Sequence, residues 1–292
     1  MKTNLKILLI AVLAISCTTS GNKSNETESI KIIKDASYRA DNITDEYEKE
    51  RCKLDLYLPA NKTDFPVLVW FHGGSLKHGS KDGKPNIELA SNFAKKGIAV
   101  ATVNYRLSPR VTYPAYIDDA AAAVAWVAKN IENYGGNEKK VFMVGHSAGA
   151  YLVLMLALDS TFLQKYDCNY MNVAGVIPLS GQTMTHYTVR EEMGIENPEE
   201  TPLVNEAAPQ FHAKKRTPPM LIVCGDKDSP DRKEENRVLI ELLEEAGNTK
   251  IVYKEINNRT HWGLVKEMPS ENDPLAKEIM AFININMKEQ IK

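Results

Sequence analysis

Residues 141–158 place the strongest constraint on the fold of this chain. A short apolar run at 141–144 is followed at once by G-H-S-A-G at 145–149, and then by a stretch that is apolar on all sides to residue 158. A helix without a polar face has to be buried all round, and a continuously apolar strand is typical of a sheet that is covered on both faces. The segment therefore predicts a sharp strand-to-helix turn inside a layered domain.

The rest of the body alternates between strand-like and helix-like segments. Apolar or alternating runs predict strands, while Ala-rich or amphipathic stretches between them predict helices. This order predicts an α/β fold with a mostly parallel sheet and helices on both faces. The predicted strands are 52–58, 65–71, 98–105, 141–144, 173–179, 220–224 and 251–256, and the predicted helices are 114–130, 147–158, 231–246 and 274–287.

Composition excludes several classes of protein. Hydrophobic residues make up 43% of the 292 residues, which is enough apolar surface for a folded core rather than a disordered chain. The 36 basic and 38 acidic residues give a formal net charge of −2, which argues against a nucleic-acid-binding protein. Four cysteines are too few for a disulfide scaffold. An ordinary globular domain is therefore expected.

The N-terminal residues are expected to be a targeting segment. Residues 1–16 carry two lysines and then an apolar run that is too short to span a membrane, as in a secretory signal peptide. The sequence A-I-S-C at 14–17 resembles a bacterial lipobox, which implies lipid attachment at Cys17 and a cell-envelope location; plain secretion is the alternative. Residues 18–34 are polar and predict a flexible tether after the lipidated Cys17. A single domain is then expected over 35–292, with membrane contact only through the anchor.

The pentapeptide at 145–149 has the G-x-S-x-G pattern of a nucleophile elbow. The turn is so tight that the residues two places before and after the serine have to be tiny, which Gly145 and Gly149 satisfy. The bend lifts the Ser147 hydroxyl above the sheet, and the following helix directs amide groups at developing negative charge. A glycine-rich turn without chemistry is the alternative interpretation.

A second motif, H-G-G-S at 72–75, follows the predicted strand 65–71. It matches the H-G-G-G oxyanion motif with Ser75 in the last glycine position. A carbonyl that becomes tetrahedral needs two or three donors about 3 Å away. The backbone amides of Gly74, Ser75 and Ala148 are the natural set, and the supporting residues are expected to be His72, Gly73, Gly145, His146 and Gly149. A packing role for His72 alone is the alternative.

With both motifs in place, the chain resembles the α/β-hydrolases, and among them the esterases that carry H-G-G-G and G-x-S-A-G. Further agreement comes from L-D-L-Y-L-P at 54–59, N-Y-R-L-S-P at 104–109, D-D-A-A-A-A-V-A-W-V at 118–127 and G-G-N at 135–137. The resemblance covers roughly residues 50–265. It implies a triad in the order serine, acid, histidine, with Ser147 as the nucleophile.

The resemblance also indicates the other two triad members. The pattern G-x-x-D after the strand 220–224 places the acid at Asp228, while Asp226 and Asp231 remain alternatives. His261, shortly after the last predicted strand, resembles the catalytic histidine of the family. Trp262 is expected either to line the site or simply to pack. The other histidines outside the two motifs, His78, His186 and His212, lie in polar loops and are expected at the surface.

The long segment 181–218 shows no clear period and is the candidate lid or substrate wall. The sequence contains no H-E-x-x-H, no paired C-x-x-C, no P-loop and no dinucleotide fingerprint. The reaction is therefore expected to need no metal and no cofactor.

Three functions remain open. The first is a serine esterase that cleaves small or sugar-linked carboxylic esters through an acyl-enzyme. The second is an amide or formamide hydrolase of the arylformamidase type, or a peptidase, because H-G-G and G-H-S-A-G also occur there. The third is a surface binding protein on a retired hydrolase scaffold, since a fold does not dictate a function.

Overall fold

The computed structural model describes residues 29–39, 43–270 and 272–289. The predicted signal peptide (1–16), Cys17 and most of the predicted tether lie outside the described residues.

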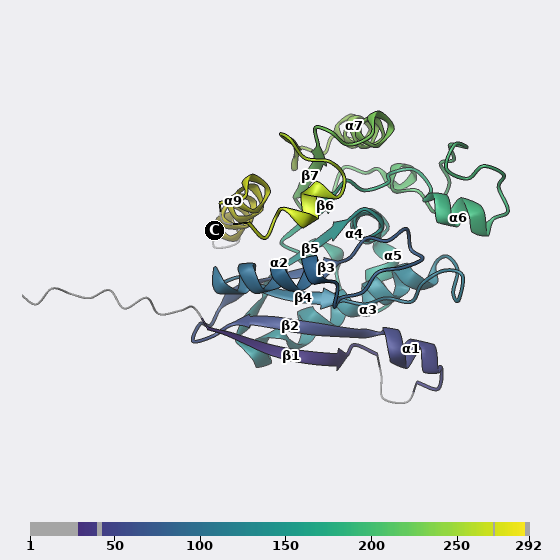
Figure 1. Cartoon of the computed structure of the whole chain (residues 1–292). Coiled ribbons are helices and arrows are strands. Elements are labelled where there is room, and N and C mark those ends of the chain that lie inside the picture. Colours follow the sequence, from purple (N-terminus) through teal and green to yellow (C-terminus); the bar gives the residue numbers. More distant parts are fainter. Residues whose placement is uncertain (1–28, 40–42, 271, 290–292) are drawn as a thin grey trace, which may run out of the picture.

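The described residues form one eight-stranded sheet in the order β1-β2-β4-β3-β5-β6-β7-β8 (Figure 1). Strands β3 to β8 are mutually parallel, while β2 runs antiparallel to both of its neighbours, β1 and β4. The sheet is therefore mostly parallel, as predicted. The strands are β1 (Ile30–Ser37), β2 (Lys53–Pro59), β3 (Phe65–Phe71), β4 (Ala99–Val103), β5 (Gly136–His146), β6 (Gly175–Leu179), β7 (Met220–Gly225) and β8 (Ile251–Ile256).

Helices cover both faces of the sheet, because side chains of a buried strand point alternately to either side. In β3, Val67, Val69 and Phe71 enter one hydrophobic core, while Leu68 and Trp70 enter the other. Helices α3, α4 and α7 contribute to the first core, and α2, α8 and α9 to the second. The helices are α1 (Glu46–Arg51), α2 (Lys84–Lys95), α3 (Ala115–Asn130), α4 (Ala148–Leu158), α5 (Ser160–Gln164), α6 (Tyr187–Glu192), α7 (Pro230–Glu245), α8 (Gly263–Lys266) and α9 (Pro274–Glu289), with 3-10 turns η1 (Ile131–Tyr134), η2 (Tyr170–Asn172) and η3 (Pro209–His212).

Helix α4 starts directly after Ser147, and every one of its residues is buried. This confirms the prediction of a helix enclosed on all sides. The carboxyl ends of the parallel strands meet at one edge of the sheet, which is where ligands bind in folds of this type. Both motifs and the two candidate triad partners follow such strand ends.

Several parts of the fold were not predicted, namely strand β1, helix α2 and the short helices α1, α5, α6 and α8. Strand β1 begins at Ile30, inside the segment predicted as a tether, so the domain boundary at residue 35 is wrong. The strand is a half-exposed edge strand whose pairing with β2 shifts register between Ile33 and Ala36, and it therefore lacks a regular alternation. Helix α2 was also missed, although Leu89 and Phe93 form an apolar stripe on it.

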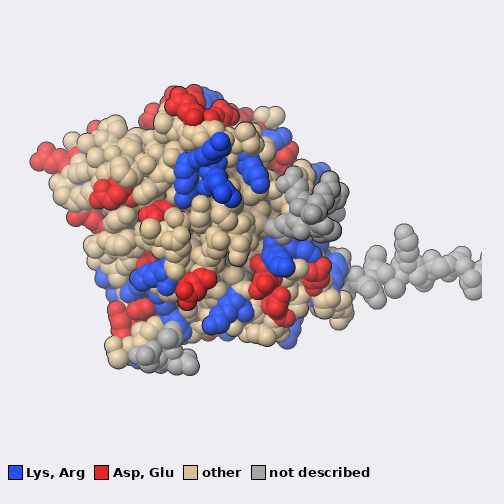
Figure 2. Space-filling model, turned by 180° about the vertical axis from the view of Figure 1, so that it is seen from behind, with Lys and Arg blue, Asp and Glu red and all other residues tan. Residues whose placement is uncertain are grey.

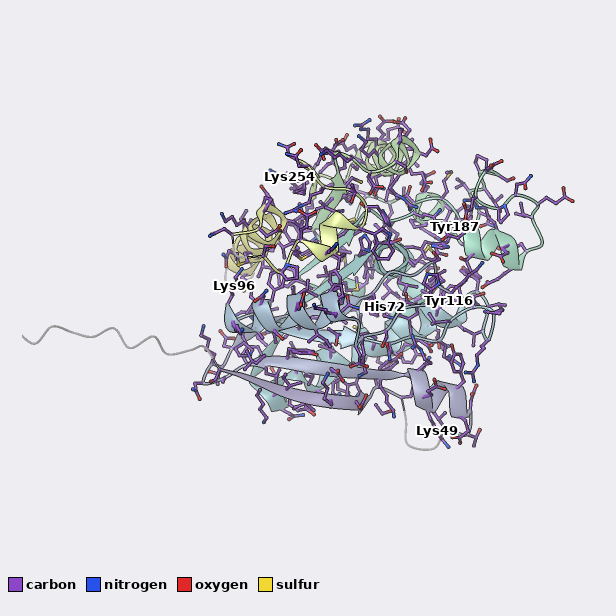
Figure 3. All side chains as sticks on the ribbon, viewed as in Figure 1. Lys49, His72, Lys96, Tyr116, Tyr187 and Lys254 are labelled. Atoms are coloured by element: carbon purple, nitrogen blue, oxygen red, sulfur yellow. The ribbon has the colours of Figure 1, made fainter. Side chains whose placement is uncertain are left out.

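The segment 181–218 is anchored to the body of the domain. Glu192, at the end of α6, accepts hydrogen bonds from the Tyr113 amide (2.8 Å) and the Tyr116 hydroxyl (3.1 Å) through the same carboxylate oxygen. Tyr151 in α4 donates a hydrogen bond to the Ala207 carbonyl at 2.8 Å. Figure 3 labels Tyr116 and Tyr187, the first residue of α6. The segment is therefore packed against α3 and α4.

Acidic and basic side chains alternate over the lower part of the face shown in Figure 2, while its middle is mostly uncharged. This agrees with the near-balanced charge of the sequence. Among the described residues, no helix combines the length and the apolar character that are needed to cross a bilayer.

Candidate active site

Ser147 occupies the predicted sharp turn between β5 and α4. Its backbone angles are φ 55° and ψ −115°, an unfavourable conformation for a residue with a Cβ. The turn explains both flanking glycines: a Cβ on Gly145 would lie 2.3 Å from the Gly149 carbonyl oxygen, and a Cβ on Gly149 would lie 2.1 Å from the Phe71 carbonyl oxygen. The close packing of backbone on backbone holds the partly exposed serine above the strand ends.

The loop 72–75 lies directly against this turn. A Cβ built on Gly73 would be 3.2 Å from the Ser147 Cβ, so the two motifs are neighbours in space. Gly74 has a φ of 122° and no room for a side chain, because a Cβ would lie 2.0 Å from the His78 carbonyl oxygen. His72 is buried and stacks on Tyr105, with ring centroids 4.5 Å apart.

The three amides predicted to form an oxyanion hole have no hydrogen-bond acceptor among the described residues. In the described part of the chain, no intramolecular hydrogen bond is donated by the backbone N–H of Gly74, Ser75 or Ala148. Ser75 adopts a left-handed φ of 59°, the conformation that glycine would adopt more easily at this position. Serine in place of the last glycine of H-G-G-G is therefore accommodated, but with an unfavourable backbone conformation at this residue.

His261 and Asp228 meet beside this turn. The carboxylate oxygen Oδ2 of Asp228 lies 3.2 Å from Nδ1 of His261. The His261 ring centroid lies 4.6 Å from that of His146, the residue before Ser147, and the His261 carbonyl oxygen is 2.9 Å from Nε2 of His146. Among the described residues no hydrogen bond joins Ser147 to the imidazole; such contacts often form only when a substrate is bound.

The structure distinguishes the three carboxylates that the sequence left open. Asp226 accepts a hydrogen bond from the Arg259 amide at 3.0 Å and so holds the turn that follows β8. Asp231 is exposed in the first turn of α7. Asp228 is the one of the three that is bonded to His261.

Sequence reasoning missed Ser180, which is fully buried after β6. Its hydroxyl donates a hydrogen bond to Oδ2 of Asp228 at 2.5 Å. Burial alone would raise the pKa of Asp228, but the hydrogen bonds from His261 and Ser180 outweigh it and hold that pKa below its usual value. The carboxylate therefore stays ionised. The position of Ser180 at a strand end was the signal that could have identified it.

The segment 181–218 also supports the oxyanion loop. The Tyr187 hydroxyl donates a hydrogen bond to the Ser75 hydroxyl, and the Thr188 hydroxyl donates one to the Ser75 carbonyl at 2.6 Å. The predicted substrate wall is thus in direct contact with one of the predicted oxyanion residues.

The expected surface position of His186 is wrong. Its side chain is buried between the rings of Tyr151 and Tyr187, with centroids 5.2 and 4.6 Å away, and Nδ1 accepts a hydrogen bond from the Thr188 amide at 3.1 Å. The polar sequence around it gives no sign of this burial, because the covering rings come from α4 and α6. His78 is exposed as expected, and His212 is partly exposed.

Buried histidines make the stability of the fold depend on pH. Burial is the largest cause that lowers the pKa of His146 to about 3 and that of His72 to about 4, and it lowers the pKa of His186 as well. Below pH 6.5 the unfolded chain binds protons at these sites, while the folded chain does not. Each histidine is therefore expected to lower the free energy of unfolding by about 1 kcal/mol per pH unit below pH 6.

We expect the thermal unfolding midpoint of the wild-type protein to fall steadily from pH 7 to pH 5. The decrease per pH unit should be smaller in His146→Asn. The exposed His78→Asn is the matched control and should keep the wild-type slope. A midpoint that does not change with pH, or equal slopes in His146→Asn and wild type, would contradict this explanation. Differential scanning calorimetry across the range provides the measurement.

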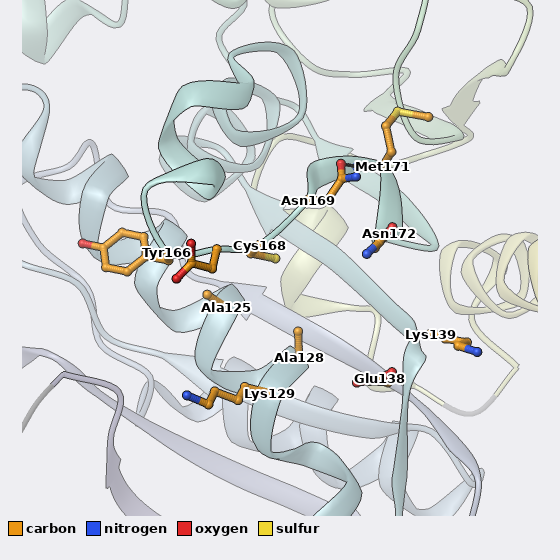
Figure 4. Close-up of a pocket in the computed structure, with 11 residues that line it drawn as sticks. Ala125, Ala128, Lys129, Glu138, Lys139, Tyr166, Cys168, Asn169, Met171 and Asn172 are labelled. Carbon is orange, nitrogen blue, oxygen red and sulfur yellow. Dashed lines mark hydrogen bonds between the residues drawn. The ribbon is translucent and has the colours of Figure 1, made fainter.

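A pocket of about 670 Å³ lies away from the predicted site residues (Figure 4). It is bounded by α3, the beginning of β5 and the connection from Tyr166 to Asn172. Its β5 residue Glu138 is nine positions before Ser147, which corresponds to roughly 30 Å along an extended strand. The pocket therefore belongs to the opposite edge of the sheet and contains none of the predicted site residues.

One group of possible metal ligands, Glu48, Cys52 and Asp119, occurs among the described residues. Its two carboxylates are paired with arginines: Asp119 contacts Arg39 and Arg106 at 2.5 and 2.7 Å, and Glu48 contacts the same two side chains. These ion pairs already neutralise the acids, so the cluster acts as a structural network that joins α1 to α3.

The model of the BD-FAE family matches residues 54–243, which is more than half of the chain. The matched region contains the H-G-G-S loop, the serine turn and Asp228. It ends before His261.

Curated relatives resemble the chain over different lengths. Esterase LipQ of Mycobacterium tuberculosis is 28% identical over 215 residues, covering 67% of this chain and 50% of that protein. The chain thus spans about half the length of this relative. Kynurenine formamidase of Danio rerio is 26% identical over 268 residues, which cover 87% of each chain.

A truncated carbohydrate esterase from gut microbiota has a similar structure. It superimposes with a TM-score of 0.73 at 20% sequence identity, over 90% of this chain and 98% of that one. At this identity the likeness establishes the fold, which is that of the α/β-hydrolases.

Proposed function

The chain belongs to the BD-FAE family and has the α/β-hydrolase fold, and from this premise we propose that it is a serine esterase that cleaves carboxylic esters through an acyl-enzyme. The observation that carries the proposal is the hydrogen bond between Asp228 and His261 beside the strained turn at Ser147. The esterase relative LipQ supports the same reaction class.

In the proposed reaction, the Ser147 hydroxyl attacks the ester carbonyl while Nε2 of His261 accepts its proton. Asp228 accepts a hydrogen bond from the Nδ1–H of His261, which holds the required tautomer and stabilises the imidazolium. His261 then donates the proton to the leaving alcohol. Water, deprotonated by the same imidazole, releases the acid and restores the serine.

The oxyanion is proposed to accept hydrogen bonds from the amides of Gly74, Ser75 and Ala148. All three lack an intramolecular acceptor among the described residues. Donors that are held in place before the reaction stabilise the charge without a reorganisation cost, and loss of one typically lowers kcat about 100- to 1,000-fold.

We further propose small acyl esters of sugars as the substrate class. Trp262 is 63% exposed and its ring contacts those of both His146 and His261, so an apolar surface lies beside the reacting groups. Apolar faces of sugar rings pack well on exposed aromatic side chains. The structural neighbour described as a carbohydrate esterase supports this choice.

The proposal is tested with the soluble domain, p-nitrophenyl acetate and a fluorophosphonate probe. We expect turnover of the ester and covalent labelling of Ser147, identified by peptide mass spectrometry. A panel of acetyl, butyryl, feruloyl and sugar esters then ranks the substrates. Absence of both turnover and labelling in a folded preparation would reject the esterase assignment.

A formamide hydrolase is the second candidate, because the zebrafish relative of that name aligns with 87% of this chain. The same triad and oxyanion donors suit the hydrolysis of an ester bond and of a formamide bond. If N-formylkynurenine is cleaved with a higher kcat/KM than every ester of the panel, the formamidase assignment replaces the esterase one.

We also propose that the protein is exported and anchored through a lipid on Cys17, with residues 1–16 removed. Support comes from the sequence alone, since these residues lie outside the described part of the chain. Mass spectrometry of the protein from its native host tests this: an unmodified Cys17 would rule out the anchor.

A further inference from the structure

Two arginines close to the candidate active site have no acidic partner among the described residues. Arg190 in α6 is only 2% exposed; its guanidinium donates to the Thr201 carbonyl, but the buried Nε has no partner. Arg232 lies in the first turn of α7, and its side chain has no hydrogen bond in the described part of the chain, although Nη1 is buried. Neither guanidinium has a carboxylate within ion-pair distance among these residues.

The contacts of α7 bring Arg232 to the site. The helix begins shortly after Asp228, and its Asn236 side chain donates a hydrogen bond to the Gly181 carbonyl at 2.9 Å. The positive charge of Arg232 lowers the pKa values of His146, His186 and Arg190. Arg232 and Asn236 are four residues apart and therefore lie on the same face of α7, so Arg232 is on the face that is turned toward Gly181, the neighbour of Ser180.

An uncompensated buried cation is costly. Burial is the largest cause that lowers the pKa of Arg190, and the charge of Arg232 lowers it further. Glu235 and Glu199 act in the opposite sense, but neither forms an ion pair with Arg190, and Oε2 of Glu235 accepts a hydrogen bond from the Thr183 amide at 3.1 Å. Unpaired buried groups in a native fold call for an explanation, and a bound ligand is one.

A purely structural role explains only part of this arrangement. Arg190 does hold the segment 181–218 through the Thr201 carbonyl, which accounts for one of its five N–H donors. Arg232 makes no comparable contact in the described part of the chain, so its buried Nη1 is left without an acceptor.

We infer that Arg232, assisted by Arg190, forms an anion subsite that binds a carboxylate on the substrate. A guanidinium matches a carboxylate with two parallel hydrogen bonds, and such charged bonds are among the strongest in proteins. The inference rests on the proposed esterase function and narrows its substrates to esters that also carry an acid group, such as those of an acidic sugar or a hydroxy acid.

Two matched substrate pairs test the inference on either side of the ester bond. The pair 4-acetoxybenzoate and 4-acetoxybenzamide places the acid in the leaving group. The pair 4-nitrophenyl 4-carboxybenzoate and 4-nitrophenyl 4-carbamoylbenzoate places it in the acyl group. Each kcat/KM value is first divided by the rate of alkaline hydrolysis of the same ester. In at least one pair, we expect the corrected kcat/KM of the acid to exceed that of the amide by about tenfold or more, mainly because the KM of the acid is lower.

Variants assign the preference to the arginine. In Arg232→Gln the ratio of kcat/KM for the acid to kcat/KM for the amide is expected to fall to about one. Arg232→Lys should retain part of the preference, because a lysine keeps the positive charge but cannot form two parallel hydrogen bonds with a carboxylate. The matched control is Arg237→Gln on the same helix, whose side chain is 49% exposed and paired with Glu255 at 2.7 Å. This control should keep the wild-type ratio.

Equal rates for acid and amide in both pairs, or an unchanged ratio in Arg232→Gln, would overturn the anion subsite. The outcome is separable from failure of the esterase proposal. If p-nitrophenyl acetate is turned over and Ser147 is labelled while the acid preference is absent, the subsite alone is rejected. If turnover and labelling are both absent, the esterase proposal itself fails.

Discussion

Replacement of Ser147 by alanine is expected to lower kcat for p-nitrophenyl acetate by about 10⁴-fold or more. Without the hydroxyl there is no covalent intermediate, and the oxyanion donors can assist only a direct attack by water. Alanine keeps the Cβ and therefore meets the same backbone conformation, with φ near 55°, as serine does. The fold should be preserved, so a loss of activity reports on chemistry.

Ser160→Ala is the matched control for this change. Ser160 begins α5, just beyond the far end of α4, about 16 Å along the helix from Ser147. We expect wild-type kinetics from the control and unchanged circular dichroism from both variants. If Ser147→Ala retains more than a few per cent of the wild-type kcat, the acyl-enzyme mechanism is wrong.

Replacement of Gly149 by alanine is expected to cost more than about 3 kcal/mol of folding stability, or to prevent folding. The new methyl carbon would lie 2.1 Å from the Phe71 carbonyl oxygen and 2.8 Å from that of His72. Both atoms belong to the backbone at the end of β3, in the centre of the sheet, so they cannot move aside without breaking the strand pairing. The clash would also displace the oxyanion loop.

Gly194→Ala provides the comparison. Gly194 has a φ of 76°, but a Cβ there would meet no atom within 4 Å, so the change isolates the cost of the left-handed backbone at about 1 kcal/mol. Urea denaturation of both variants gives the two free energies. A Gly149→Ala protein that unfolds within about 1 kcal/mol of wild type would show that the turn is looser than described.

The central strands and the serine turn could be predicted from the sequence because their signals are local. The run 65–71 coincides with β3, and the apolar stretch after Ser147 with α4. The strand β1 was missed because its pairing with β2 is irregular and one side of the strand has no neighbour in the sheet. For an edge strand, the periodic pattern is weak and tertiary contacts decide the structure.

The candidate site was predictable where a motif marks it and not where distant elements meet. The turn at Ser147 and the loop 72–75 lie where their motifs placed them. The choice among three nearby aspartates needed the position of His261, which lies 33 residues beyond Asp228. The contacts of Ser180 with Asp228 and of His186 with Tyr151 join elements that are far apart in the chain, and no local pattern encodes them.

The direction of β1 determines on which side of the domain the chain enters, relative to Ser147. Because β1 and β4 both run antiparallel to β2, β1 points the same way as the parallel strands, and Ile30 lies at the edge opposite to Ser147. The polypeptide ahead of Ile30 therefore joins the molecule at the pole remote from the reactive serine. If the domain is immobilised through that end on a bead or a vesicle, the edge of the sheet that carries Ser147 faces the medium, where even a long polymer can approach it.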